Sequence, residues 1–456
     1  MFDDLSWVHG FGTLVPAIPL ALFAILSFVA LFDRRLSEQS IGALTMASNL
    51  SGLLATIFVC IHLVVSGEEH VEILIGDWAV IPHYDFQVKL TFDVLSIAFV
   101  LLTFVLCGVI GWFATRYLHR ERGFNRFFVL FALFQAGMVI ASLGDNIAVL
   151  FIGWEMVGLS GAFLVAFFQE RPAPPRQGLH IWIVYRVADA ALLGAAFAMH
   201  HHSGTADFNH LFGDAPWPNE NSNATPTQAL IVGFLLLIAA AGKSALIPFS
   251  GWLPRAMEGP TPSSAIFYGA LSVHLGAYLL LRASPLLEAS PLLAGIVVTL
   301  GLLTALYAYL AGSVQTDIKS ALAYASLVQV GLIVAEIGFG WRYIPLAHMV
   351  GHACLRTVQF LRAPTLLHDY HTLSNAIGDH LHPPGGPLGR LMPARLQLWL
   401  YRFGMERGYL DAFLSAWVVM PFILAFRYFD KLEHCWMRFL KGERTSPDLN
   451  AIKEPK

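Results

Sequence analysis

Two ionisable residues of opposite charge lie inside long apolar stretches of the chain. Lys243 lies in LIVGFLLLIAAAGKSALIPFSGWL, and Glu155 lies in IAVLFIGWEMVGLSGAFLVAFF. A charged side chain at the centre of a bilayer costs roughly 2.5–3.5 kcal/mol, so it is seldom present without a function. Pro248 follows Lys243 and removes a backbone donor, which predicts a broken helix beside the charge. Together these features predict an ion pathway, and a structural ion pair that only fixes helix packing is the alternative.

Three polar residues recur at helical spacing in the stretch LAHMVGHACLRTVQFL. His348, His352 and Arg356 stand at i, i+4 and i+8, which places them on one stripe of a helix. Histidine exchanges protons near neutral pH, so the stripe predicts a proton relay. His274, in another apolar stretch, could connect Lys243 to this stripe. Buried structural histidines and a metal-binding pair are alternatives, although the sequence offers neither an HExxH glutamate nor a third metal ligand.

Further polar residues lie within or beside apolar stretches. Arg186 and Asp189 are three residues apart and predict a pair on one helix face, for which structural and functional roles are equally open. Asp145 and Asn146 precede an apolar stretch and predict a helix N-cap. Polar side chains along a later helix predict either a water chain or hydrogen bonds between helices, and these are Tyr324, Ser326 and Gln329.

The composition identifies the kind of protein that must position these residues. Of 456 residues, 56% are hydrophobic and only 13% are charged, which predicts an all-α polytopic membrane protein. Basic residues form too few clusters for nucleic-acid binding. The four cysteines are scattered and no GxGxxG follows a strand, so we expect neither a metal nor a cofactor in this chain. Redox chemistry is therefore expected in another subunit, and whether the chain belongs to an enzyme stays open.

About twelve apolar stretches are long enough to cross a bilayer. The predicted organisation has four parts: N-terminal spans and an external β-hairpin in 1–90, a conducting core in 91–362, a loop with an amphipathic helix in 363–408, and a terminal span and tail in 409–456. The predicted spans are 12–32, 42–65, 92–114, 126–143, 146–168, 178–200, 228–252, 262–282, 292–312, 321–340, 344–362 and 409–428.

The distribution of basic residues predicts the orientation. Nearly all Lys and Arg residues of the loops fall on one predicted side, and the opposite side carries only Lys89, Arg282 and Arg342. The positive-inside rule then places the first set in the cytoplasm and the amino terminus outside, in the cell (inner) membrane. In the segment 363–408, apolar residues interleave with arginines, which predicts a basic helix on the cytoplasmic surface; a solvated linker is the alternative.

Five blocks of the sequence resemble the antiporter-like, proton-translocating subunits of respiratory complex I, specifically the NuoL type, which is shared with the MrpA component of Mrp antiporters. They recur in the order of that family and cover about residues 85–362. The blocks are GWEMVGLSGAFLVAFF, YRVADAALL, GKSALIPFSGWLPRAMEGPTPSSA, GSVQTDIKSALAYASLVQVG and HMVGHACLRTVQFL.

The resemblance implies roles for the residues singled out above. Glu155 takes the place of the essential glutamate and Lys243 that of the central lysine, while His348 and His352 match the two histidines toward the exit. Three departures stand out. The family's histidine near the start of the eighth span is Tyr268 here, the lysine after the paired histidines is Arg356, and the second of the two inverted repeats is incomplete. Arginine cannot release a proton, so that relay position becomes a fixed charge.

The sequence therefore predicts a proton- or Na⁺-translocating membrane subunit of a multi-subunit energy-coupling complex. In the predicted resting state Glu155 holds Lys243 protonated, and the proton later moves through His274 to the His348 stripe. The host implied first is an NADH:quinone oxidoreductase. A Dab-type inorganic carbon uptake complex with a soluble zinc partner, an energy-converting hydrogenase, and a non-conducting scaffold are the alternatives. The expected partners are membrane and peripheral subunits and the lipid bilayer.

Overall fold

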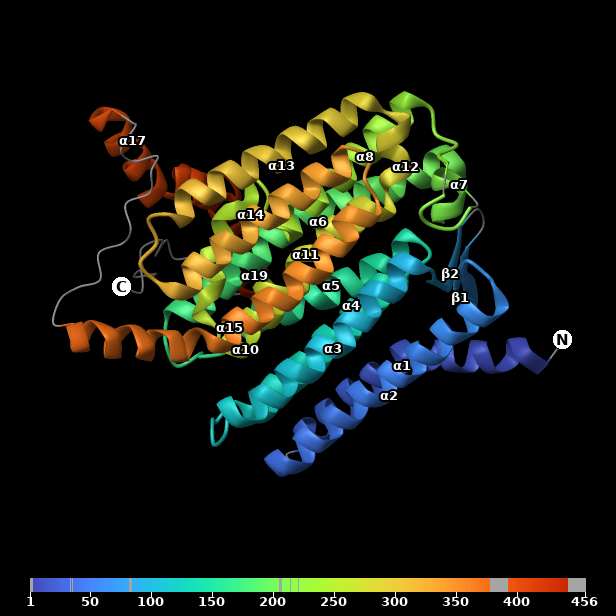
Figure 1. Ribbon diagram of the computed structural model, residues 1–456, viewed down its shortest axis with the longest axis horizontal. Coiled ribbons are helices and arrows are strands. Elements are labelled where there is room, and N and C mark those ends of the chain that lie inside the picture. The colour runs from blue at the N-terminus through green and yellow to red at the C-terminus, as the bar shows by residue number, and fades with distance from the viewer. Residues whose placement is uncertain are drawn as a thin grey trace.

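The structure, a computed structural model, is a bundle of long helices with a two-stranded sheet at one end (Figure 1). It describes residues 3–32, 34, 36–81, 84–204, 207–213, 215–219, 221–377 and 393–441. Within this part of the chain the helices dominate, which confirms the predicted all-α polytopic membrane fold.

The long helices of the first half are α1 (Asp3–Leu31), α2 (Glu38–Ser66), α3 (Val94–Tyr117), α4 (Phe124–Leu143), α5 (Ile147–Val165) and α6 (Ala173–Ser203). The helices that follow are α7 (Phe208–Phe212), α8 (Pro226–Lys243), α9 (Trp252–Arg255), α10 (Thr261–Ser264), α11 (Ser272–Arg282), α12 (Ser284–Ala289), α13 (Pro291–Gly312), α14 (Ile318–Gly338) and α15 (Tyr343–Ile377). The chain closes with α17 (Ala394–Met405), α18 (Leu410–Leu414) and α19 (Met420–Leu440).

Side chains set several helix starts as the sequence suggests. Asp93 and Ser96 form a capping box at the start of α3, and Asn146 accepts a hydrogen bond from the Val149 amide at the start of α5. Asn146 is thus the predicted cap. Asp145 beside it has a different role, which is described below.

Eleven helices of the described residues are long and apolar enough to cross a membrane, one fewer than the number predicted. The stretch 344–362, which was predicted as a span, lies in α15 and is absent from the eleven. Its histidines, Arg356 and Gln359 lower the hydropathy of that helix. The helix also continues to Ile377, where the sequence suggested a loop from residue 363 onward.

Two of the central helices are interrupted. The predicted break near Pro248 is confirmed, because α8 ends at Lys243 and helical structure resumes only at a short 3-10 helix, Phe249–Gly251. The second interruption was not predicted: a π-helix, Ala265–Ala270, separates α10 from α11. Such π segments occur mostly at functional sites, since they displace the side chains that follow.

The sheet is the predicted hairpin, with β1 (Val71–Ile81) antiparallel to β2 (Tyr84–Phe92). Ion pairs connect the hairpin and the adjoining loops to the bundle. Lys89 contacts Asp207 at 2.6 Å, and Arg282 binds both carboxylate oxygens of Asp93 at 2.5 and 3.1 Å. The three basic residues assigned to the outer side therefore lie toward the hairpin end, where Arg342 also pairs with Glu288.

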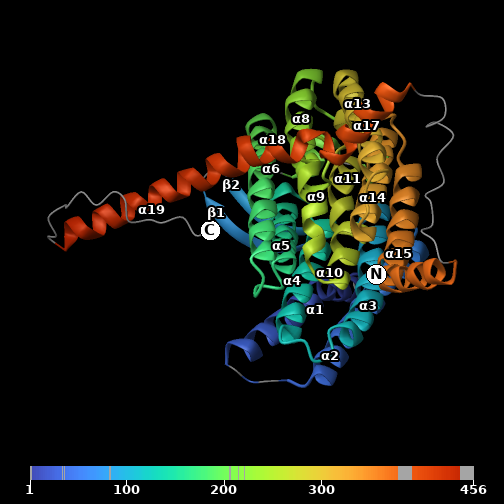
Figure 2. The same ribbon diagram turned by 90° about the vertical axis from the view of Figure 1, so that its left-hand side faces the viewer.

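The C-terminal helices pack on the bundle along α17 and α18, where α17 contacts α13 and the hydroxyl of Tyr307 donates to the carbonyl oxygen of Arg407, and then leave it. Asp411 in α18 binds Arg255 through two hydrogen bonds of 2.6 and 2.7 Å, which fastens α18 to the segment after the first break. Beyond it, α19 extends sideways from the bundle (Figure 2) and has no buried residue. The predicted terminal span, 409–428, thus lies in α18 and the first part of α19 and is not enclosed by the other spans. The predicted amphipathic helix lies partly outside the described residues, and its described part is α17.

Asp145 lies at the hairpin end with 4% of its surface exposed. Burial, reinforced by the nearby carboxylate of Glu72, raises the pKa of the Asp145 side chain to about 7. Because this pKa is above the unfolded value, the group opposes folding progressively as the pH rises from about 4 to about 7.

We therefore expect Asp145→Asn to stabilise the protein more at pH 8 than at pH 5. The difference should be about 2 kcal/mol, because asparagine carries no charge at either pH. Thermal unfolding of the purified protein in detergent at both pH values measures it. Asp77→Asn, at an exposed position of the same hairpin, is the control. An equal effect of Asp145→Asn at both pH values would contradict the prediction.

Candidate functional site

Lys243 is the last residue of α8 and is completely buried. Its ammonium group donates a hydrogen bond of 2.9 Å to the carbonyl oxygen of Trp154. It also lies over the rings of Trp154 and Tyr185, at 4.9 and 4.6 Å from their centroids. Aromatic ring faces and a carbonyl oxygen attract the ammonium group without supplying a counter-charge. Within the described part of the chain, no direct ion pair therefore holds the proton on Lys243.

The carboxylate of Glu155 does not pair with Lys243. It forms an ion pair with Arg186, whose guanidinium also binds Asp189 at 2.9 Å. The indole of Trp154 donates to the other oxygen of Asp189 at 2.5 Å. The predicted Arg186–Asp189 pair is therefore present, but the expected Glu155–Lys243 resting pair is not. Arg186 takes the place of Lys243 because α6 brings a second cation to the same carboxylate.

The break after Lys243 has its own supporting contacts. Ala245 adopts a positive φ of 55°, which turns the chain out of the helix immediately after Lys243. The indole of Trp252 then donates a hydrogen bond of 2.9 Å to the carbonyl oxygen of Gly242. A backbone carbonyl freed by the break is thus satisfied inside the bundle, which is the condition for interrupting a helix at membrane depth.

His274, His352 and Arg356 form one continuous hydrogen-bonded chain. The Nε of Arg356 can only donate, so Nε2 of His352, at 3.2 Å, must accept. The proton of His352 is then on Nδ1 and is donated to Nε2 of His274 at 2.9 Å. His274 in turn donates from Nδ1 to the carbonyl oxygen of Ala270, in the π-helix, at 2.7 Å. Both rings are neutral in this arrangement, and every hydrogen bond points the same way.

His348 belongs to a different group from the other two histidines. Its Nδ1 faces the carboxylate of Glu336 at 2.9 Å and its Nε2 faces Oε1 of Gln329 at 3.0 Å. The rings of His348 and His352 contact edge to face, with 6.5 Å between centroids. The three residues of the predicted stripe do lie on one helix, but His352 and Arg356 bind each other while His348 has partners of its own. Glu336 was not among the predicted site residues, although it is the one carboxylate within the apolar part of its span.

Lys243 and His274 are neighbours without being in contact. The hydroxyl of Ser244 donates to the carbonyl oxygen of Val273 at 2.6 Å, so the residues beside Lys243 and His274 touch. No hydrogen bond joins Lys243 directly to His274 in the part of the chain that the structure describes. Ser272, two residues before His274, has a buried hydroxyl without a protein partner.

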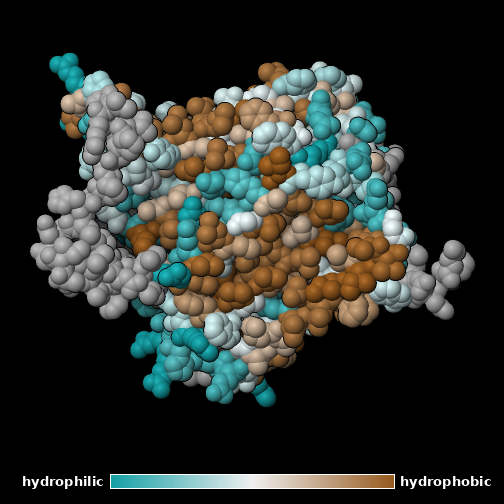
Figure 3. Space-filling model, viewed as in Figure 1, coloured by the Kyte–Doolittle hydropathy of each residue, from teal (hydrophilic) through white to brown (hydrophobic). Residues whose placement is uncertain are grey.

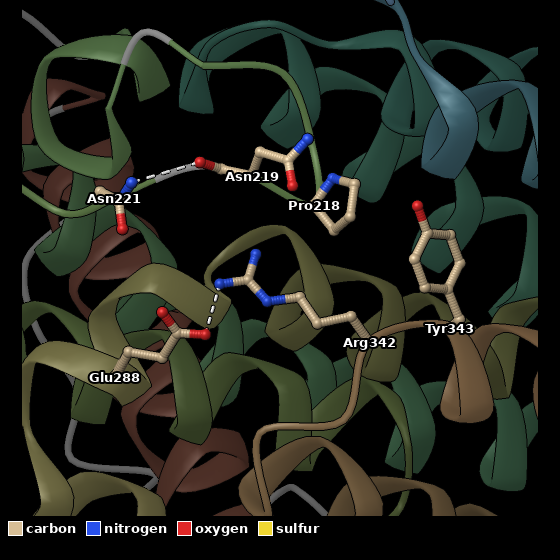
Figure 4. A pocket seen from close by; sticks show the side chains of 6 residues that line it. All are labelled: Pro218, Asn219, Asn221, Glu288, Arg342 and Tyr343. Carbon is tan, nitrogen blue, oxygen red and sulfur yellow. Dashed lines mark hydrogen bonds and ion pairs between the residues drawn. The ribbon is translucent and has the colours of Figure 1, made fainter.

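Other features fall outside this group. Among the described residues there is no cluster of three or more His, Cys, Asp or Glu that could hold a metal ion. A surface hollow of about 610 Å³ lies at the hairpin end (Figure 4), and none of the predicted site residues lines it. It is lined by Pro218, Asn219, Asn221, Glu288, Arg342 and Tyr343.

Comparison with known proteins identifies the family. Residues 144–380, more than half of the chain, match the family described as NADH:quinone oxidoreductase/Mrp antiporter, TM. The chain belongs to this family. Residues 78–128 also match the N-terminal region of chain 5 of NADH-ubiquinone oxidoreductase (complex I). The resemblance inferred from the five sequence blocks is thereby confirmed.

Individual relatives agree with this assignment. The chain is 33% identical over 298 residues to NADH-ubiquinone oxidoreductase chain 5 of Cryptococcus neoformans, covering 65% of this chain and 44% of that protein. The corresponding chain of Schizophyllum commune is 34% identical over 296 residues, with 65% and 42% covered. The chain thus spans less than half the length of the curated relatives it matches.

Two solved structures share the fold. A chain of the Mrp complex from Dietzia sp. DQ12-45-1b superimposes with a TM-score of 0.65 and 25% identity, covering 87% of this chain and 42% of that one. A chain of the membrane-bound sulfane sulfur reductase, an archaeal respiratory membrane complex, gives a TM-score of 0.66 at 18% identity, covering 89% and 87%. The second similarity extends over nearly the whole of both chains and supports the fold alone.

Gly158 in α5 provides a test of how tightly the cations are held. A methyl group added there would lie 3.0 Å from Nζ of Lys243 and 3.4 Å from Nη2 of Arg186. We expect Gly158→Ala to lower the free energy of unfolding by about 1 kcal/mol, since Nζ of Lys243, which is bound to the Trp154 carbonyl oxygen, must shift by a few tenths of an ångström. Gly295→Ala, where no atom lies within 4 Å of the added carbon, should be neutral or slightly stabilising. Thermal unfolding in detergent compares the two, and equal melting temperatures would contradict this packing.

Proposed function

We propose that this chain is the ion-translocating membrane subunit of a multi-subunit energy-coupling complex and that it carries protons. The observation that supports the proposal is the buried ammonium group of Lys243, close to Glu155 and Asp189 but without a direct ion pair to either, beside a hydrogen-bonded pair of histidines. Both groups can lose and regain a proton, and both lie where the backbone of a spanning helix is interrupted. A scaffold would have no need to keep these costly groups inside the bundle.

In the first step of the proposed cycle, Arg186 releases one of the two carboxylates that it binds. In the structure it binds both Glu155 and Asp189. When Arg186 moves toward Asp189 alone, Glu155 becomes free to attract the ammonium group of Lys243. When it returns, Lys243 is left with ring faces and a carbonyl oxygen, and its proton can pass on through water toward His274. Moving one elementary charge across a membrane potential of 100 mV changes the free energy by about 2.3 kcal/mol. The change of ion-pair partners must therefore involve free energies of this size.

The next step depends on Arg356. In the structure Nε2 of His352 is occupied by Arg356, so the histidine pair cannot conduct until this hydrogen bond opens. Arg356 has a second partner available, because its Nη1 binds Oε1 of Gln359 at 2.5 Å. A shift of the guanidinium toward Gln359 would free His352 to take up or release a proton. Arg356 would then act as a fixed positive charge that opens and closes the relay without carrying a proton itself.

The host complex is part of the proposal. The relatives are named as chains of NADH-ubiquinone oxidoreductase, and the similar structures come from an Mrp complex and an archaeal respiratory membrane complex. These names support a hetero-oligomeric membrane assembly. We further propose that other subunits carry any redox centre and that the chain lies in a cell membrane with the amino terminus outside, as the distribution of basic residues predicts. Purification of the chain from native membranes with its partners would identify the host, and a zinc protein in place of redox subunits would select the carbon-uptake alternative.

Lys243→Ala should abolish proton flux while leaving membrane insertion intact, since it removes the cost of burying the charge. Flux is measured with the complex reconstituted in liposomes that contain a pH-sensitive dye. Lys431→Ala, at an exposed position of α19, is the control. Glu155→Gln should be nearly as harmful, and the double variant no worse than either single one, because members of one relay are not additive. Flux near the wild-type rate in Lys243→Ala would refute the proposal.

A further inference from the structure

Glu336 and His348 form an ion pair near the hairpin end of the bundle. Glu336 is close to the end of α14, and His348 is in the second turn of α15. Their side chains are 18% and 26% exposed, in contrast to the fully buried His274. The chain of titratable groups that begins at Lys243 therefore approaches the surface at this pair.

This pair lies on a face that is otherwise apolar. In Figure 3 hydrophilic residues interrupt the apolar surface in the region where α14 and α15 run side by side. Leu355 and Val358 of α15 and Leu292 of α13 are among the exposed apolar residues of these helices. Ionisable side chains on such a face are costly, so they require a function that apolar residues cannot provide.

The geometry around His348 indicates how the pair handles a proton. Both ring nitrogens face an oxygen atom, Glu336 on one side and Gln329 on the other. An imidazolium ring donates from both nitrogens and satisfies both contacts at once, with the glutamate as its counter-ion. After Nδ1 has given its proton to Glu336, the neutral ring still donates from Nε2 to Gln329, and Nδ1 accepts a hydrogen bond from the protonated carboxyl group. His348 and Glu336 can thus exchange a proton at little electrostatic cost.

The other ion pairs of the same end differ from this one: the histidine pairs His62–Glu68 and His70–Glu72 have exposed carboxylates at the hairpin, away from the relay, and two further carboxylates are held by arginines. Asp93 is bound by Arg282 and Glu288 by Arg342. Arginine stays protonated at all accessible pH values, so these two pairs can hold structure but cannot pass a proton. Among Asp93, Glu288 and Glu336, Glu336 is the one whose partner can give its proton away.

We propose that Glu336 is the terminal proton-exchange group of this chain, the carboxylate through which the relay opens to the hairpin side; this rests on the proposed function. The Nδ1–H bond of His348 breaks and an O–H bond forms on Glu336, so the pair remains neutral during the transfer. Glu336 then releases the proton to the surface and becomes a carboxylate again. His348 regains a proton from the relay and restores the ion pair.

The test compares flux in three variants of the reconstituted complex. Glu336→Gln cannot carry a proton and should lower proton flux by about tenfold or more, while Glu336→Asp keeps a carboxyl group and should retain a substantial part of it. Glu288→Gln removes the carboxylate of the pair with Arg342, at the same end, and should leave flux unchanged. If Glu336→Gln conducts normally while Lys243→Ala does not, the terminal role is refuted and the proposed function stands. Normal flux in both variants would refute the proposed function as well.

A chemical readout works even if a variant fails to assemble. Dicyclohexylcarbodiimide reacts with carboxyl groups that are protonated in an apolar setting, and mass spectrometry of peptides locates the label. If Glu336 passes protons, the wild-type protein should be labelled at this residue, and labelling should inhibit flux. His348→Ala should increase the labelling, because the loss of the imidazolium leaves Glu336 protonated. A Glu336 that stays unlabelled in both proteins would show a permanent structural carboxylate and would refute the inference.

Discussion

The burial of the Lys243 ammonium group without a carboxylate partner is the constraint on which the rest of the site depends. Within the described residues its contacts are a backbone carbonyl oxygen and two aromatic faces. A full ion pair at this depth would hold the proton too firmly for exchange, and an empty apolar pocket would exclude the charge altogether. The observed surroundings lie between these limits. They require the helix to break immediately afterwards, so that the ammonium group reaches the carbonyl of a neighbouring helix.

The carboxylates closest to Lys243 contact Arg186 and not the ammonium group itself. Arg186 binds both Glu155 and Asp189, and the two carboxylates together balance the two cations Arg186 and Lys243, although neither carboxylate contacts the ammonium group directly. Arg356 likewise donates to neutral side chains, those of His352 and Gln359. Fixed cations that cannot release protons thus stand beside groups that can. In the proposed relay, Lys243 and the histidines are therefore the groups that hold the proton, and the arginines are fixed charges beside them.

The hairpin end differs in character from the centre of the bundle. There the acidic residues Asp93 and Glu288 are bound by arginines, and Lys89 binds Asp207 across the loop before α7. These pairs connect elements far apart in the sequence and have no titratable cation near neutral pH. Glu336 differs from them because its partner is a histidine whose ring contacts His352; the histidine pairs of Glu68 and Glu72 lie at exposed positions beside the hairpin. A rigid frame around one exchangeable pair is the arrangement expected where a relay reaches the surface.

The sequence alone determined the features that depend on local physics. Hydropathy marked the spans, Pro248 marked the break after Lys243, and alternation marked the hairpin, because each follows from a short stretch of chain. Family membership also followed from ordered local blocks. The partners of the charges were decided by the tertiary structure: Arg186 rather than Lys243 for Glu155, and Glu336 for His348. These contacts join different helices, and which side chains meet depends on helix packing and on the π-helix before α11, which no local pattern specifies.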